Sequence, residues 1–159
     1  GTHSKHVYCY QGFIETFGTF LSGELFEWLT NHSVLAGSAM RSQWTEAMRG
    51  AFEQGIIDVA REKSILKSAF HVRAWDRLGK KSPQENYYYL SGLVIGSELS
   101  TLVRRSADRI IVAASGELCR PYRMAADYLG LADNTTYLSG DALEFALLRA
   151  HGAVAAIGG

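Results

Sequence analysis

The first five residues, GTHSK, combine a glycine, two hydroxyl side chains, a histidine and a lysine. A turn of this kind presents backbone amides, while Thr2, Ser4 and Lys5 add two hydroxyl donors and one ammonium, which together suit phosphoryl oxygens. Small polar residues also populate ordinary surface turns, so the residues alone leave both interpretations open. His3 and Ser4 do not indicate a hydrolase, because neighbouring strand residues point to opposite faces and no G-x-S-x-G turn occurs.

A second turn that could bind a ligand lies at Ser115 and Gly116, within ASGEL. It follows a β-branched run and precedes a helical stretch, so a ligand could approach the glycine backbone and the free amides of the helix start. An ordinary turn between a strand and a helix explains the same residues equally well. The chain contains no Walker A sequence and no G-x-G-x-x-G fingerprint.

Two charged residues also have a structural and a functional interpretation. Glu24 follows Ser22 and Gly23 at a predicted helix start, where a carboxylate favours the positive end of the helix dipole. Arg73 lies in the apolar segment SAFHVRAW, where its guanidinium requires a partner. That partner is either a carboxylate of the fold or a carboxylate of a substrate.

Composition narrows the classes of function. The 159 residues carry 16 basic and 16 acidic side chains and no basic run, which argues against a nucleic-acid partner. The two cysteines, Cys9 and Cys119, form no C-x-x-C pair, and the five histidines show no metal-binding spacing. No signal peptide or apolar run of membrane length occurs, so we expect a cytoplasmic protein without a membrane partner.

The elements that must position these residues change in character along the chain. Strands are predicted over 5–10 and 13–20 around a Gln11–Gly12 turn, followed by a helix that Ser22 caps. The middle is helical, over 43–61, 62–77 and a buried helix that begins at the capping box SPQE (82–85). Gly92 and Gly96 leave one face of that last helix without side chains.

The last third has the pattern of parallel strands joined by helices. Short strands are predicted over 109–114, covered on both faces, and over 135–138. A helix ending near Gly130 separates them, and another runs from Ala142 to about His151. The sequence therefore predicts an α/β fold with a hairpin start, a helical middle and parallel strands at the end.

Four stretches together resemble the C-terminal half of the 2-keto-3-deoxygalactonokinase (2-dehydro-3-deoxygalactonokinase) family. They are GTHSK (1–5), FGTFLSGELFEWLTNHSVL (17–35), FHVRA (70–74) and YLSGLVIGSEL (89–99). The resemblance implies an actin-like, hexokinase-type kinase with two lobes of ribonuclease-H-like topology and a cleft between them. Because an Asp-x-Gly-Thr loop is absent, we expect residues 1–159 to be one domain, the C-terminal lobe, with a strand and the N-terminal lobe upstream.

The resemblance also implies roles for individual residues. ATP phosphates would face Gly1, Thr2, His3, Ser4 and Lys5. Adenosine would lie near Ser115 and Gly116, and the sugar acid near Ser22, Gly23 and Glu24. We add Arg73 as a partner for the sugar-acid carboxylate. No catalytic base and no protein ligand for a metal is assigned. The family commonly has tryptophan where this chain has His6, and TFMTGE where it has TFLSGE.

The implied reaction is ATP-dependent phosphorylation of 2-keto-3-deoxygalactonate to its 6-phosphate, with Mg²⁺, in galactonate catabolism. Phosphoryl transfer depends on positioning and charge neutralisation, so half a cleft is expected to be inactive alone. Two other functions stay open. One is a non-catalytic nucleotide- or sugar-binding regulatory module with the same fold, and the other is a lobe that forms homodimers through its exposed cleft face.

Overall fold

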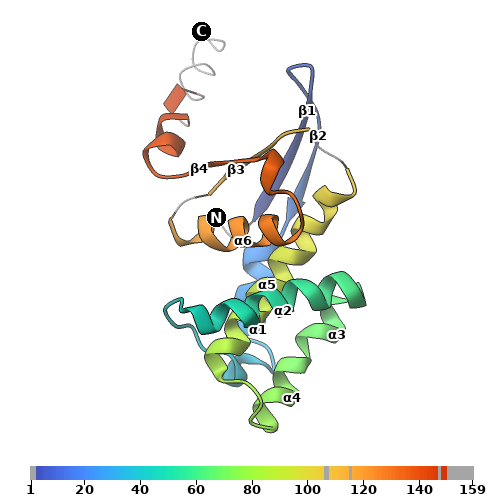
Figure 1. The fold of residues 1–159 in the computed structure, drawn as a ribbon, viewed down its shortest axis with the longest axis vertical. Coiled ribbons are helices and arrows are strands. Elements are labelled where there is room, and N and C mark those ends of the chain that lie inside the picture. The colour runs from blue at the N-terminus through green and yellow to red at the C-terminus, as the bar shows by residue number, and fades with distance from the viewer. Residues whose placement is uncertain (1–2, 106–107, 115, 147, 150–159) are drawn as a thin grey trace. The chain divides into compact units, whose positions relative to one another are not determined.

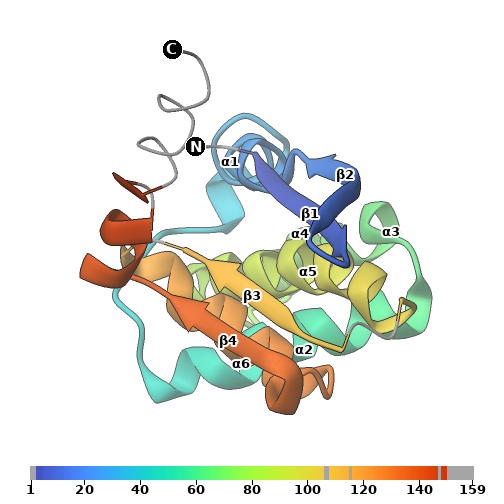
Figure 2. The same cartoon turned by 90° about the horizontal axis from the view of Figure 1, so that it is seen from above.

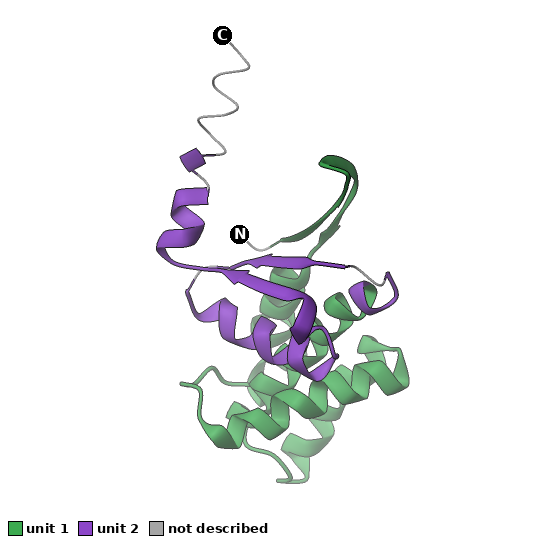
Figure 3. Cartoon of the chain, turned by 45° about the horizontal axis from the view of Figure 1, so that its top comes forward, with its two compact units in different colours: residues 1–101 green, residues 102–159 purple. Residues whose placement is uncertain are grey.

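The computed structural model describes residues 3–105, 108–114, 116–146 and 148–149. The chain divides into two compact units, Gly1–Thr101 and Leu102–Gly159 (Figure 3). Strands open the first unit, helices fill the middle of the chain and a second pair of strands lies in the second unit. The predicted mixed α/β composition, with its hairpin start and helical middle, is confirmed.

The first unit begins with the predicted hairpin (Figure 1). Strands β1 (Ser4–Tyr10) and β2 (Phe13–Phe20) pair antiparallel, with Tyr10 opposite Phe13. The two turn residues have φ values of 49° at Gln11 and 84° at Gly12. Positive φ at both central positions matches the right-handed twist of the strands that the turn joins.

The helix after the hairpin, α1 (Ser22–Asn31), begins at Ser22, one residue earlier than it would if Ser22 were its N-cap. Leu21 occupies the N-cap position, and no side chain caps the helix. The prediction that Ser22 caps α1 is therefore wrong. Its hydroxyl donates to Glu98 instead, so a distant carboxylate has displaced the local capping interaction.

Three helices follow a short 3₁₀ turn, η1 (Ala36–Ser38): α2 (Glu46–Glu62), α3 (Ile65–Ala69) and α4 (His71–Arg77). The predicted continuous helical stretch over 62–77 is interrupted. Lys63 adopts the left-handed conformation with φ of 52° and ends α2. Ser64 then accepts a hydrogen bond from the Lys67 backbone amide and starts α3.

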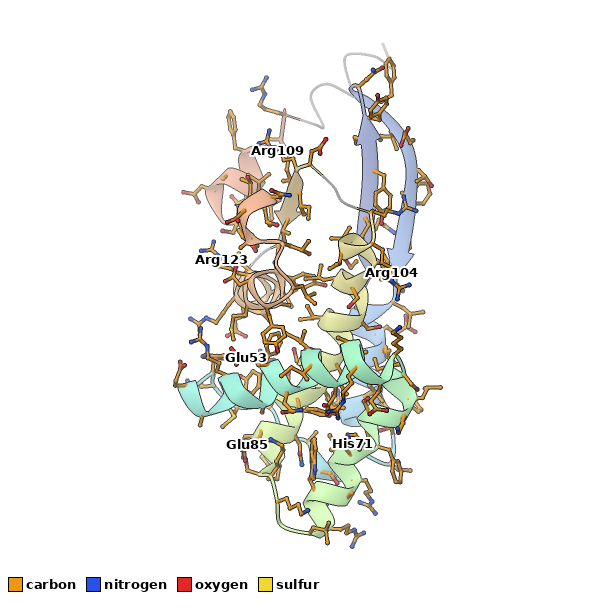
Figure 4. The ribbon with its side chains drawn as sticks, turned by 45° about the vertical axis from the view of Figure 1, so that its right-hand side comes forward. Glu53, His71, Glu85, Arg104, Arg109 and Arg123 are labelled. Carbon is orange, nitrogen blue, oxygen red and sulfur yellow. The ribbon has the colours of Figure 1, made fainter. Side chains whose placement is uncertain are left out.

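The longest helix, α5 (Pro83–Val103), begins at the predicted capping box. The Ser82 hydroxyl accepts from the Glu85 amide at 3.2 Å, and the Glu85 carboxylate accepts from the Ser82 amide at 2.8 Å. Glu85 is labelled at the start of the helix in Figure 4. These reciprocal bonds satisfy two amides that the helix itself leaves without partners.

Helices α2 and α5 cross (Figure 1), and glycines lie where their backbones meet. A Cβ on Gly92 would lie 2.0 Å from the Phe52 carbonyl oxygen, and one on Gly55 would lie 2.3 Å from the Tyr89 carbonyl oxygen. Gly96 similarly faces the backbone of Ile56. The predicted glycine face of α5 is confirmed, and the close approach buries the core of this unit around Tyr89, Leu90, Leu93 and Val94.

In the second unit, β3 (Ile110–Ala113) and β4 (Thr135–Leu138) pair in parallel, as predicted. The 3₁₀ turn η2 (Gly116–Leu118), helix α6 (Cys119–Tyr128) and the 3₁₀ turn η3 (Ala132–Asn134) connect them. Helix α6 packs against both strands (Figure 2). Residues 141–146, 148 and 149 are helical, and the predicted end of that helix near His151 lies outside the described residues.

Burial along β3 departs from the prediction. Side chains alternate between partly buried and exposed, and Ile111 is 55% exposed. The prediction that this strand is covered on both faces is wrong for this chain, because α6 packs on one face of the strand pair.

The described part of the chain contains no helix with both the length and the apolar character that crossing a bilayer requires.

Candidate functional site

Two of the predicted site residues meet on one carboxylate in the first unit. Ser4, at the start of β1, donates to Glu98 Oε1 at 2.7 Å. Ser22, at the start of α1, donates to Glu98 Oε2 at 2.5 Å. The predicted phosphate turn and the predicted sugar turn are therefore joined through a residue on α5, 94 positions after Ser4.

His6 supplies a third contact to the same carboxylate. Its Nε2 lies 3.0 Å from Glu98 Oε1, and the side chains of His6 and Glu98 are 9% and 1% exposed. The imidazole also packs on Phe20, with ring centroids 4.4 Å apart. His6 Nδ1 is buried and has no hydrogen-bond partner among the described residues. An ionised carboxylate only accepts hydrogen bonds, so the two serine hydroxyls donate to Glu98, and His6 does so in the tautomer that carries the proton on Nε2.

Strand periodicity explains why Ser4 and His6 reach the same acceptor. Residues i and i+2 of a strand share a face, and along β1 Ser4, His6 and Tyr8 are partly buried while Lys5 and Val7 are exposed. The face of β1 that carries the hydroxyl of Ser4 therefore turns toward α5. The ammonium of Lys5 lies on the opposite, solvent-exposed face.

Of the remaining residues of the predicted phosphate turn, His3 lies near the start of α1 and Lys5 lies beside the end of β2. His3 Nε2 is 3.0 Å from Glu24 Oε2, and both side chains are largely exposed. Lys5 Nζ is 3.3 Å from the Thr19 hydroxyl. Gly1 and Thr2 lie outside the described residues. The structure thus brings together His3 and Ser4 from the first turn with Ser22, Gly23 and Glu24 from the second.

A hollow of about 250 Å³ adjoins Ser22 and Glu98. Apolar side chains make most of its wall, and hydroxyl and carboxylate groups also line it. Its lining consists of Phe20, Leu21, Ser22, Leu25, Ile65, Val94, Ser97, Glu98 and Thr101.

A second buried carboxylate, Asp58, lies among the helices of the same unit. Its Oδ2 accepts from the Tyr89 hydroxyl at 2.9 Å, and its Oδ1 accepts from Gln54 Nε2 at 2.8 Å. His71 Nδ1 lies 3.2 Å from the Tyr89 hydroxyl, and His71 is labelled on α4 in Figure 4. Burial, followed by the hydrogen bond and the charge of Asp58, raises the pKa of Tyr89 above its usual value.

The other predicted site residues lie elsewhere. Arg73 is partly buried on α4, which packs near Tyr89 in the first half of α5. Glu98 comes nine residues after Tyr89, about 13 Å further along the helix axis. The structure therefore does not bring Arg73 together with Ser22. In the second unit, Gly116 begins η2 with φ of 57°, while Ser115 lies outside the described residues.

No cluster of three or more histidine, cysteine, aspartate or glutamate side chains suited to a metal ion occurs within the residues that the structure describes. Mg²⁺ often takes most of its ligands from substrate phosphates and water.

Sequence reasoning missed Glu98 and His6 as members of this site. One signal in the sequence could have identified Glu98, because it is the sole charged residue between Asn86 and Val103. A carboxylate in such an apolar helix requires hydrogen-bond donors from other elements. Which donors those are could not be found from the sequence.

A family model described as 2-keto-3-deoxy-galactonokinase matches residues 1–150. The chain belongs to this family. The resemblance stated from the sequence motifs is thereby confirmed, and the match includes both turns and Glu98.

Individual members of the kinase family are also similar to this chain. A protein of Rhizobium meliloti named as a probable 2-dehydro-3-deoxygalactonokinase is 30% identical over 134 residues, which cover 82% of this chain and 44% of the relative. The 2-dehydro-3-deoxygalactonokinase of Escherichia coli is 32% identical over 144 residues, which cover 89% of this chain and 47% of the relative. The chain therefore spans about half the length of these relatives.

A solved structure agrees with this assignment. A crystal structure from Sinorhizobium meliloti that carries the same kinase name superposes with a TM-score of 0.82 at 29% sequence identity. The alignment covers 97% of this chain and 52% of the solved chain.

Proposed function

We propose that this chain is the C-terminal lobe of a two-lobed, actin-like kinase that phosphorylates 2-keto-3-deoxygalactonate on its 6-hydroxyl. The observation that carries the proposal is the family match over residues 1–150. The relatives that share the family carry this kinase name, and this chain spans about half of their length. The other half of the cleft would then come from a second lobe.

ATP would bind with its phosphates beside the start of β1. Support comes from the chemistry of His3 and Lys5, whose side chains are exposed and carry donors that suit phosphoryl oxygens. Ser4 already donates its hydroxyl proton to Glu98, so its part would be to fix the strand rather than to contact phosphate. Mg²⁺ would neutralise charge on the transferred group, bound mainly by the phosphates and water.

The sugar acid would lie against the first turn of α1. Gly23 and Glu24 are exposed there, and the Glu24 carboxylate is 3.0 Å from His3. This proximity supports a common site, because a sugar hydroxyl bound at Glu24 would lie near the phosphate-binding turn. Arg73 as the partner of the acid carboxylate, and Gly116 as an adenosine contact, stay predictions.

Two lobes are required by the chemistry. Phosphoryl transfer is accelerated by holding the acceptor in line and by neutralising charge in a site without bulk water. A single lobe offers donors on one side only. We therefore expect the isolated 159 residues to release no ADP in response to substrate.

The proposal is tested by a coupled assay of ADP release, carried out on the full-length protein of which these residues are proposed to form one lobe. The substrates are 2-keto-3-deoxygalactonate and its epimer 2-keto-3-deoxygluconate, with the isolated chain Gly1–Gly159 as the control. Turnover by the longer protein alone supports the proposal. Turnover by the isolated chain refutes the half-site, and silence from a folded longer protein with both acids refutes the substrate.

A further inference from the structure

We infer that Glu98 is a positioning residue that fixes the ATP-side strand β1 and the sugar-side turn of α1 in one arrangement. The inference rests on the proposed function for the identity of the two sides. It goes beyond that function because it assigns the coupling of the two substrates to one buried carboxylate on a third element.

The geometry gives each carboxylate oxygen to a different element. Oε1 faces β1 and takes the contacts of Ser4 and His6, whereas Oε2 faces α1 and takes the hydroxyl of Ser22. Glu98 is thus a bridge rather than a partner of either element alone. A movement of β1 relative to α1 would have to break a charge-assisted hydrogen bond on one side.

The support beneath the carboxylate is rigid. Glu98 follows Gly96, whose missing side chain lets α5 approach Ile56 and Val59 of α2. A position fixed by packed helices transmits placement to whatever it binds. The first turn of α1 also presents Gly23 and Glu24, so fixing Ser22 fixes these neighbours as well.

The same geometry argues against Glu98 as the catalytic base. A general base must reach the substrate proton directly or through one water. Both oxygens of Glu98 already accept from protein donors, and the side chain is 1% exposed. Its influence on the reaction therefore passes through Ser4, His6 and Ser22.

The Glu98→Gln substitution tests whether the carboxylate joins β1 to α1. A glutamine keeps one acceptor oxygen, and its amide nitrogen only donates, so on one side the charge-assisted bond is replaced at best by a neutral bond in which a serine hydroxyl accepts. Ser4→Ala and Ser22→Ala each release one side while Glu98 stays in place. Asp58→Asn is the matched control, because Asp58 is nearly as buried but its hydrogen-bond donors come from α2 and α5 and its ion-pair partners, His71 and Arg61, from α4 and α2.

Kinetics of the longest protein that contains these residues give the first measurement. We expect Ser4→Ala to raise KM mainly for ATP and Ser22→Ala mainly for the sugar acid. Glu98→Gln should raise both by about tenfold to a hundredfold, as small misplacements do. Adding either serine change to Glu98→Gln should have little further effect, since the three residues act as one unit. Asp58→Asn should lower the unfolding midpoint and leave both KM values unchanged.

Hydrogen–deuterium exchange gives a second measurement that needs no activity. In Glu98→Gln, amide exchange should become faster in peptides covering residues 3–10 and 20–26, and Asp58→Asn should leave these peptides unchanged. Unchanged exchange at either peptide overturns the inference, and so does faster exchange with unaltered KM values. If the wild-type protein phosphorylates neither acid, the proposed function fails and the exchange result alone decides whether Glu98 joins the two turns.

Discussion

Two buried carboxylates, Asp58 and Glu98, occupy the first unit with nearly the same exposure, 3% and 2%. The hydroxyl of Tyr89 and the amide of Gln54 donate to Asp58, and both donors belong to the crossing helices. Glu98 instead accepts from β1 and α1, the elements that carry the predicted site residues. Two carboxylates with similar burial therefore have different kinds of partner, and those of Glu98 come from the elements that carry the predicted site residues.

The two carboxylates also differ in the chemical type of the side chains that donate to them. Asp58 holds a phenol whose pKa is raised by burial first and by the carboxylate second, which keeps Tyr89 neutral and fixed in the core. Glu98 holds two serine hydroxyls and an imidazole at the edge of a hollow. The first arrangement stabilises a helix crossing, and the second places two turns.

The largest expected effect comes from disturbing the crossing that supports both clusters. Gly55→Ala on α2 would place a Cβ 2.3 Å from the Tyr89 carbonyl oxygen and 2.7 Å from the Leu93 nitrogen. We expect the free energy of unfolding to fall by about 3 kcal/mol, because backbone atoms cannot yield as a side chain does. Urea-induced unfolding measures the change.

Gly50→Ala, five residues earlier on the same helix, is the matched control. A Cβ there would meet nothing within 4 Å. Alanine should stabilise the helix by up to about 1 kcal/mol, through its higher helix propensity. Equal effects of the two changes would contradict the close crossing and, with it, the rigid support proposed for Glu98.

A smaller effect is expected in the pH dependence of the unfolding free energy, which reports on Tyr89 beside Asp58. The pKa of Tyr89 is raised in the folded protein from the usual value of 10.0, so the folded state keeps this proton longer than the unfolded chain. The stabilisation is complete below pH 10 and is lost as pH rises above it, at about 1.4 kcal/mol per pH unit. Unfolding titrations at pH 8 and pH 11 should show this loss in the wild type.

Tyr89→Phe should remove that part of the slope, and it should cost about 1 to 2 kcal/mol at pH 8 because the Asp58 acceptor loses its donor. The other tyrosines and the lysines titrate in both proteins, so the difference between the two slopes isolates Tyr89. An identical alkaline slope in the variant would show that Tyr89 titrates normally. The comparison of the two carboxylates would then lose its electrostatic basis.

The smallest effect is expected at a carboxylate near the surface, which tests the importance of burial in this comparison. Hydrogen bonds from the Ser82 backbone and side chain lower the pKa of Glu85 below its usual 4.5. The resulting stability is present above pH 4.5 and is lost as pH falls through the lowered value. Glu85→Gln keeps an acceptor for the Ser82 amide but removes the charge, so it should cost only about 0.5 kcal/mol at pH 7, where solvent screens the charge, and less in acid, measured by urea unfolding at pH 7 and pH 3. A cost that grows in acid would contradict the capping box.

Local signals in the sequence predicted the elements correctly where neighbouring residues determine the outcome. The Gln11–Gly12 turn and the SPQE capping box each depend on contacts within four residues, and both form as predicted. Glycines one turn apart on α5 likewise predicted a close helix contact, although Gly55 on the other helix was missed. Burial of β3 was misjudged, because the apolar run does not show how many faces a neighbouring element covers.

For the candidate site, the sequence predicted residue types correctly but not the partners of those residues. Residues Ser4 and Ser22 could be selected by type, since hydroxyls beside glycine suit phosphate and sugar ligands. Ser22 was nevertheless assigned the wrong partner, because its competing acceptor lies 76 positions away. Glu98 could be recognised as a charge in an apolar helix, but its donors could not be chosen among the polar residues of the chain.

The sequence by itself thus determined the hairpin, the capped helix, the parallel strand pair and membership of the kinase family. Each depends on residue order over short distances or on a pattern of motifs. Only the tertiary structure decided that one carboxylate on α5 accepts a hydrogen bond from β1 through one oxygen and from α1 through the other. The physical reason is that a buried charge is satisfied by whichever donors the packed helices and strands bring within about 3 Å, and sequence distance has no influence on that choice.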